Sequence, residues 1–331
     1  PIGFFFGDGC LLTNCGRALN DPLGERRAKT FHDLAKRYVN VVLPSNARYR
    51  QPEMDTAAKY GMYVIPSLNL LHGIGKENLT KADPGALQKI RDQWKIEIDC
   101  LGKHPALLAW HIYDEPMPWY CNSLLNIRDF IRAYDGKHPV IYTHQNLPLG
   151  SDKSEWQLLA SEPVIYSDCY SINEAAGRDP WLYGDVAMSN FRRVNPNADY
   201  WPTIQSYTYH YRPTLGELRI MVYHTLARGA KGMFYFTTGQ SVTGWDNPDK
   251  IRFYESPGNI WFGRDPMLDE IGRINEHLAT AGPLLLPLRF TGKYPYTVLN
   301  QQTVTAHVPC GLRPYGVVKE PMIDIGAFYG G

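Results

Sequence analysis

The sequence predicts an α/β protein built as a (β/α)8 TIM barrel with a short C-terminal β-rich tail. Short apolar segments alternate along the chain with longer segments whose apolar residues recur at the helical period, which is typical of β/α units. Crossovers between parallel strands usually carry a helix, so this alternation indicates a parallel sheet. Eight strand signals match the number of strands in a closed barrel of roughly 250 residues.

The expected strands are short and rich in β-branched and aromatic residues. They are Ile2–Phe6, Val41–Pro44, Tyr63–Leu68, Leu107–Tyr113, Pro139–Thr143, Val164–Asp168, Pro202–Tyr207 and Gly232–Phe236. The expected helices are Arg26–Val39, Gln51–Tyr60, Pro84–Leu101, Leu124–Tyr134, Leu215–Ala230 and Leu268–Thr280. A doubly wound sheet is the alternative, but it usually has a Gly-rich phosphate turn after its first strand, and Gly7-Asp8-Gly9 is too short for that turn.

The pattern changes near residue 283, which predicts a catalytic barrel over 1–283 and a separate segment over 284–331. Tyr296–Leu299 and Thr303–Ala306 are expected as short strands between polar turns. This stretch is too short for a full sandwich domain. It is expected to be a β-rich extension or a truncated accessory domain.

Bulk composition excludes some classes of function. The chain has 331 residues, of which 44% are apolar, and its net charge of +1 gives no electrostatic case for binding nucleic acid. No stretch is apolar enough to predict a membrane span. The six cysteines lack zinc-site spacing, and no cofactor is expected. The chain starts without Met, so we expect that a leader has been removed and that the protein is secreted or periplasmic. We also expect a monomer or small homo-oligomer.

Polar and aromatic residues gather where the predicted strands end. In a barrel, catalytic groups come from the C-terminal ends of the strands. The candidates there are Asp8, Asn69, Asp114, Glu115, His144, Asp168, Tyr170, Gln205, Tyr207 and Trp245. With 13% aromatic residues overall, this rim is typical of a carbohydrate site, although large barrels also use aromatic residues for packing.

The motif Asp114-Glu115-Pro116 closes the fourth predicted strand. The stretch from His104 through Trp110 to this motif resembles the strand-four motif of clan A glycoside hydrolases, in a poorly characterised branch with Asp-Glu-Pro. The resemblance covers roughly residues 1–285. It implies that Glu115 is the general acid/base, although the clan usually carries Asn where this chain has Asp114.

The chain departs from this clan at the end of the seventh strand. The clan's nucleophile there is a Glu, whereas this chain has Gln205, and an amide is not a carboxylate nucleophile. A deliberate Glu→Gln substitution is one explanation.

Three mechanisms follow from this departure. In the first, the pair Asp114-Glu115 resembles the Asp-Glu pair of hexosaminidase-type barrels, which implies that the substrate's own 2-acetamido group attacks, that Asp114 orients it and that Tyr207 or Tyr170 holds its oxygen. In the second, Glu115 is the acid and Asp168 or Asp8 activates water in an inverting reaction. In the third, the barrel only binds glycans. The pair Asp114 and Glu115 can share one site only if the strand has broken, because adjacent strand residues point to opposite faces. Structural roles for Asp114 and Asp168 remain open alternatives.

We therefore expect a glycoside hydrolase that acts on an oligo- or polysaccharide. The catalytic residues are expected to be Glu115, Asp114 and Asp168. The alternatives are a non-catalytic glycan-binding barrel and a polysaccharide lyase. A metal-dependent hydrolase is not favoured, because the histidines lie on separate elements without helical i, i+4 spacing.

Overall fold

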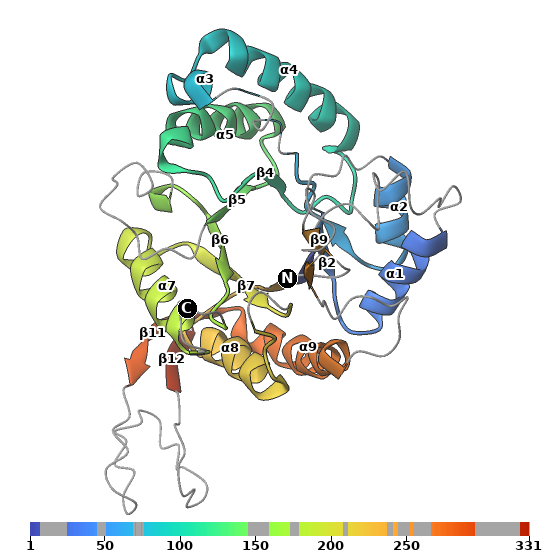
Figure 1. Cartoon of the computed structure of the whole chain (residues 1–331), viewed down its shortest axis with the longest axis vertical. Helices are drawn as coiled ribbons and strands as arrows, with labels where there is room; N and C mark the ends of the chain where they lie inside the picture. The colour runs from blue at the N-terminus through green and yellow to red at the C-terminus, as the bar shows by residue number, and fades with distance from the viewer. Residues whose placement is uncertain are drawn as a thin grey trace, which may run out of the picture.

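The computed structural model describes most of the predicted barrel and part of the tail. The described residues are 1–6, 25–44, 51–68, 70, 74, 76–144, 159–172, 179–207, 211–236, 241–243, 252–254, 266–294 and 325–330. Figure 1 shows the helices arranged around a central group of strands.

Eight parallel strands form one curled sheet in the order β3-β2-β1-β8-β7-β6-β5-β4. They are β1 (Ile2–Phe6), β2 (Val41–Pro44), β3 (Tyr63–Val64), β4 (Trp110–Asp114), β5 (Val140–His144), β6 (Val164–Cys169), β7 (Asp199–Gln205) and β8 (Met233–Phe236). Isolated parallel bridges, Val64 with Leu107 and Ser67 with His111, join the two edges of the sheet. This α/β arrangement is TIM-like, as the sequence predicts.

The helices alternate with these strands. They are α1 (Glu25–Ala35), α2 (Gln51–Lys59), α3 (Lys76–Thr80), α4 (Pro84–Leu101), α5 (Cys121–Asp135), α7 (Leu182–Val194), α8 (Leu215–Ala227) and α9 (Pro266–Leu285), with the 3₁₀ turn η2 (Pro118–Tyr120) before α5. The sequence analysis did not identify α3 or α7. In α7 the apolar residues are interrupted by Gly184 and by the pair Arg192-Arg193, which weakens the helical pattern.

Local chemistry explains where two of the predicted helices begin. At α4 the Asp83 carboxylate accepts a hydrogen bond from the Ala86 N–H at 2.7 Å, and Pro84 occupies the first turn. At α8, Thr214 and Glu217 form a reciprocal capping box. These caps satisfy amide groups that a helix start leaves without partners.

The core has two layers. One buried cluster contains residues from the strands and their immediate flanks and fills the inside of the curled sheet, with Ile141, Tyr166, Trp201 and Phe234 among its members. A second, larger cluster packs the outside of the sheet against the helices. Neighbouring residues on one strand therefore belong to different layers.

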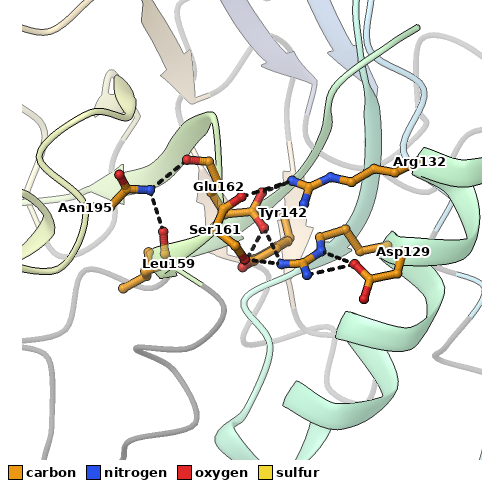
Figure 2. Close-up of polar contacts among 8 residues, drawn as sticks. Asp129, Arg132, Tyr142, Leu159, Ser161, Glu162 and Asn195 are labelled. Atoms are coloured by element: carbon orange, nitrogen blue, oxygen red, sulfur yellow. Dashed lines mark hydrogen bonds and ion pairs between the residues drawn. The ribbon is translucent and has the colours of Figure 1, made fainter. Parts of the chain in front are cut away.

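A buried polar network joins α5 to the segment before β6 (Figure 2). Glu162 accepts hydrogen bonds from Arg128 at 3.1 Å, from Arg132 at 3.4 Å and from the Tyr142 hydroxyl at 3.3 Å. Asn195, just after α7, donates to the Leu159 and Glu162 carbonyls. The network ties two helices to one strand on the outside of the sheet.

The tail contains an antiparallel pair, β11 (Leu288–Tyr294) with β12 (Ile325–Gly330). A second small pair joins β9 (Ser241–Thr243) to β10 (Arg252–Tyr254). The expected strands 296–299 and 303–306 lie outside the described residues. The domain boundary at 283 stays a prediction. Among the described helices, none has the length and apolar character that crossing a membrane requires.

Candidate active site at the carboxyl ends of the strands

The strand-four acids lie where a β-bulge breaks the regular register. His111 pairs with Ile141 and Asp114 pairs with Thr143, so three steps on β4 match two on β5. The extra residue lets side chains leave the strict in-and-out alternation at the strand end. Asp114 and Glu115 can therefore share one site, which is the condition that the sequence analysis set for them.

Glu115 has a left-handed backbone conformation, with φ of 48°. A residue that precedes a proline favours extended backbone, so Glu115 departs from the conformation that Pro116 favours. The Glu115 N–H donates to the Thr143 carbonyl at 3.1 Å, which holds the backbone in place after the bulge. Uncommon conformations of non-glycine residues often mark functional sites.

Three carboxyl groups meet at the ends of β4 and β6. Asp168 is buried with 6% exposure, whereas Glu115 is exposed. Burial raises the pKa of the Asp168 carboxyl well above its usual range, and the charges of Asp114 and Glu115 and a hydrogen bond with Glu115 raise it further. Two carboxyl groups form a hydrogen bond only when one of them carries a proton. Asp168 thus keeps its proton and donates it in the hydrogen bond to Glu115.

An aromatic wall stands beside these carboxyl groups. The rings of Tyr170 and Tyr207 lie 5.3 Å apart, and Phe236 lies 4.9 Å from Tyr207. Burial first, and then the charge of Asp168, raises the pKa of Tyr170 well above its usual range, so its hydroxyl keeps its proton. A hydrogen bond from the Tyr170 hydroxyl lowers the pKa of Asp168 and so offsets part of the rise. The wall offers apolar ring faces and a hydroxyl donor in one place.

A polar layer supports β4 from inside the sheet. The His111 Nε2 accepts a hydrogen bond from the Thr143 N–H at 3.2 Å, so the ring proton lies on Nδ1, which donates to the Ser67 hydroxyl at 2.7 Å. Burial lowers the pKa of His111 to about 3, so the ring stays neutral. His111 is thus a core residue whose ring nitrogens are both hydrogen-bonded. The neutral ring links the strands on both sides of the Asp-Glu-Pro motif.

Gln205 is fully buried, and its amide is used by backbone groups. Its side-chain oxygen accepts from the Ile172 N–H at 3.0 Å, and its nitrogen donates to the Ile172 carbonyl at 3.0 Å. The Tyr207 carbonyl lies 3.3 Å from the same nitrogen. The amide therefore clamps the segments that follow β6 and β7, and a substrate contact by Gln205 stays a prediction.

His144 also lies away from the carboxyl groups. Its ring packs 4.5 Å from Tyr142 and 6.1 Å from Phe191 of α7, with only 8% exposure. Burial lowers its pKa to about 3. Ile141 fills the inside of the sheet and Tyr142 faces the helices, so alternation places His144 on the helix side. A substrate contact by His144 stays a prediction.

Three predicted substrate contacts, Asp8, Asn69 and Trp245, lie outside the described residues and stay predictions. The supporting roles of Ser67 and Thr143 were missed, although both are polar residues near strand ends. Within the described ranges, no three His, Cys, Asp or Glu side chains are grouped as a metal site needs.

Comparisons with known proteins find similarity at the level of the fold. No protein-family model and no curated protein matches the chain by sequence. Among solved structures, the chain is similar to a GH2 beta-galacturonidase from Eisenbergiella tayi bound to galacturonate, with a TM-score of 0.64 and 15% identity over 83% of this chain and 50% of that one. A Faecalibacterium prausnitzii beta-glucuronidase gives a TM-score of 0.64 at 13% identity over 83% of this chain and 48% of that one.

A beta-galactosidase from the psychrophilic Marinomonas ef1 gives a TM-score of 0.63 at 10% identity, over 86% of this chain and 60% of that one. The chain thus spans about half to three fifths of the length of these proteins. At such low identity the similarity establishes that the chain shares the fold of their barrels.

Proposed function

We propose that the protein is a glycoside hydrolase whose general acid is Glu115. The observation that carries the proposal is the hydrogen-bonded carboxyl pair of Glu115 and Asp168 at the ends of β4 and β6. General acid catalysis needs a carboxyl group that keeps a proton near neutral pH and reaches the substrate. The proposal is also supported by the resemblance of the strand-four motif to clan A glycoside hydrolases.

The two members of the pair have different roles in this proposal. Glu115 is exposed, so it contacts the substrate and gives its proton to the leaving oxygen. Asp168 is buried, its raised pKa keeps a proton on it, and through their hydrogen bond it supplies this proton to Glu115. The half-buried Asp114 adds a third acidic group to the same site.

The direct contact of Glu115 with Asp168 bears on the choice of mechanism. An inverting enzyme keeps its two carboxyl groups roughly 6.5–9.5 Å apart so that water fits between them. Two carboxyl groups in a mutual hydrogen bond leave no such room, so Asp168 is poorly placed as the inverting base. Gln205, whose amide is hydrogen-bonded to the backbone of Ile172, stands where the clan has its nucleophile, and an amide is not a carboxylate nucleophile.

These two facts favour the mechanism in which the substrate's 2-acetamido group attacks the anomeric carbon. As its oxygen bonds to that carbon, the bond to the leaving oxygen breaks and Glu115 supplies the proton. Water then opens the cyclic intermediate while Glu115 takes a proton back. Asp114 orients the acetamido nitrogen, and a tyrosine of the aromatic wall holds the acetamido oxygen.

The test is hydrolysis of a panel of disaccharides with and without a 2-acetamido group, in both anomers. Glu115→Gln is expected to lower kcat/KM by about 10²- to 10⁴-fold, because it removes the proton donor. Glu77→Gln makes the same change on the exposed face of α3 and is expected to leave kcat/KM unchanged.

Full activity of Glu115→Gln would contradict the proposal. Binding of panel members without turnover by the unaltered protein would support a glycan-binding barrel instead. Unsaturated products that absorb in the ultraviolet would support a lyase. Hydrolysis confined to substrates without the acetamido group would exclude substrate assistance but retain the glycosidase.

A further inference from the structure

An exposed tryptophan follows the proposed acid on the same loop. Trp119 lies in η2, between β4 and α5, with 39% exposure, and the nearby Met117 is 41% exposed. Loops after the strands of a parallel sheet lie at the same edge as the strand ends, so Trp119 is on the face that carries Glu115. Large apolar side chains exposed at such an edge mark a surface for binding.

The indole of Trp119 packs against the half-buried Tyr120, which packs in turn against the buried Tyr113. Its ring lies 5.9 Å from Tyr120, and Tyr120 lies 5.4 Å from Tyr113, both in edge-to-face geometry. Tyr113 and Tyr120 also share a side-chain hydrogen bond, and Tyr113 directly precedes Asp114 on β4. The indole is thus connected by packed rings to the strand that carries the acid. A side chain fixed in this way loses little conformational entropy when a ligand binds.

The short stretch of chain between Glu115 and Trp119 limits how far the indole lies from the bond that is cleaved. Trp119 follows Glu115 by four residues, which span at most about 14 Å. The group that protonates the leaving oxygen sits beside the leaving group, so the loop that carries this group also lies beside the leaving group. A flat indole presents a large apolar face, which suits the C–H face of a pyranose ring.

From these observations we propose that Trp119 is the stacking platform for the sugar on the leaving side of the cleaved bond. The inference rests on the glycosidase function proposed above and deepens it. The substrate then has a further sugar ring on its leaving side, so the protein acts on oligo- or polysaccharides and not on glycosides with small aglycones.

Equilibrium binding tests this placement apart from catalysis. The parent protein carries Glu115→Gln so that substrates are not consumed, and the probes are the disaccharide panel and methyl glycosides of the same non-reducing sugars, titrated by calorimetry. Adding Trp119→Ala is expected to weaken disaccharide binding by roughly tenfold, the loss expected for one aromatic stacking contact. Methyl glycosides lack the leaving-side ring and are expected to bind unchanged. Trp119→Tyr is expected to restore most of the disaccharide affinity.

Tyr134→Ala is the matched control. Tyr134 has the same 39% exposure, but it lies in the last turn of α5, at the other end of the barrel, and stacks on Phe130. It is expected to leave both affinities unchanged. Disaccharide binding that survives Trp119→Ala, or an equal loss for methyl glycosides, would overturn the inference. A parent that binds no member of the panel would overturn the glycosidase proposal together with it.

Discussion

At the end of β7, the side chain of Gln205 makes the hydrogen bonds that a peptide group of a neighbouring strand would make. It pairs with both the N–H and the carbonyl of Ile172, as a neighbouring strand would, and it is fully buried. The pairing needs one acceptor and one donor, which an amide supplies and a carboxylate does not. The amide is therefore the residue type that this position requires, which argues against a carboxylate as its natural occupant.

Gln205→Glu is expected to lower the free energy of unfolding by about 2–4 kcal/mol, because it places an uncompensated carboxylate against backbone carbonyl groups. Urea unfolding measures this change. Gln51→Glu makes the same substitution at the exposed start of α2 and is expected to change stability by less than about 0.5 kcal/mol. A Gln205→Glu protein that is as stable as the parent would show that the clamp is dispensable.

Among the elements, α5 is joined to the segment before β6 through the buried carboxyl group of Glu162. Glu162 has 2% exposure and faces Arg128 and Arg132 of α5 and the Tyr142 hydroxyl of β5. Burial raises the pKa of Glu162 to about 7, although the two arginines oppose this shift. Removing one partner of such a buried group usually destabilises a protein more than the intact pair stabilises it.

This network predicts a specific dependence of stability on pH. The pKa of Glu162 is higher in the folded protein than its ordinary value of 4.5, so the folded state binds the proton more tightly. The resulting stabilisation is complete below the unfolded pKa and is lost as the pH rises through about 7. The loss is at most about 3 kcal/mol, since one pKa unit corresponds to about 1.4 kcal/mol.

Urea unfolding between pH 5 and pH 8 compares the parent with Glu162→Gln. The parent is expected to lose stability relative to the variant as the pH rises. The exposed substitution Glu77→Gln is expected to keep the pH dependence of the parent. Parallel profiles for the parent and Glu162→Gln would contradict the expected titration.

Across the whole molecule, the last helix joins the first and last strand units. Asn275 of α9 is fully buried; it accepts from the Tyr235 hydroxyl of β8 at 2.9 Å and donates to the Arg37 carbonyl after α1 at 3.0 Å. Arg37 also forms an ion pair with Asp269 at 3.1 Å. The two contacts with Arg37 connect segments more than 230 residues apart and help to hold the ring of β/α units together.

Asn275→Leu is expected to lower the free energy of unfolding by about 2–4 kcal/mol, because a buried hydroxyl and a buried carbonyl lose their partner. Tyr38→Phe removes an exposed hydrogen bond between the same two segments, with Glu276, and is expected to cost less than about 0.5 kcal/mol. Equal effects of the two variants, measured by urea unfolding, would show that Asn275 has no special part in closure.

Local sequence patterns predicted much of the architecture. The order of strands and helices follows from hydrophobic periods, which act over a few residues, and the bounds of α4 agree residue for residue because Asp83 and Pro84 set its start. Where local signals are weaker, the observed bounds differ from the expected ones. The third strand was expected to reach Leu68, but only Tyr63–Val64 form β3. The Asp-Glu-Pro motif marked the end of β4 by its position alone.

The sequence by itself determined the α/β alternation and the strand ends where acidic residues gather. Only the tertiary structure decided which of these residues meet. Asp168 lies 53 positions after Glu115, and no local pattern specifies their hydrogen bond. A single extra residue in β4 decides where Asp114 and Glu115 face, while strict alternation turns His144 toward α7. The physical reason is that strand-end direction depends on register with neighbouring strands, which is a property of the assembled sheet.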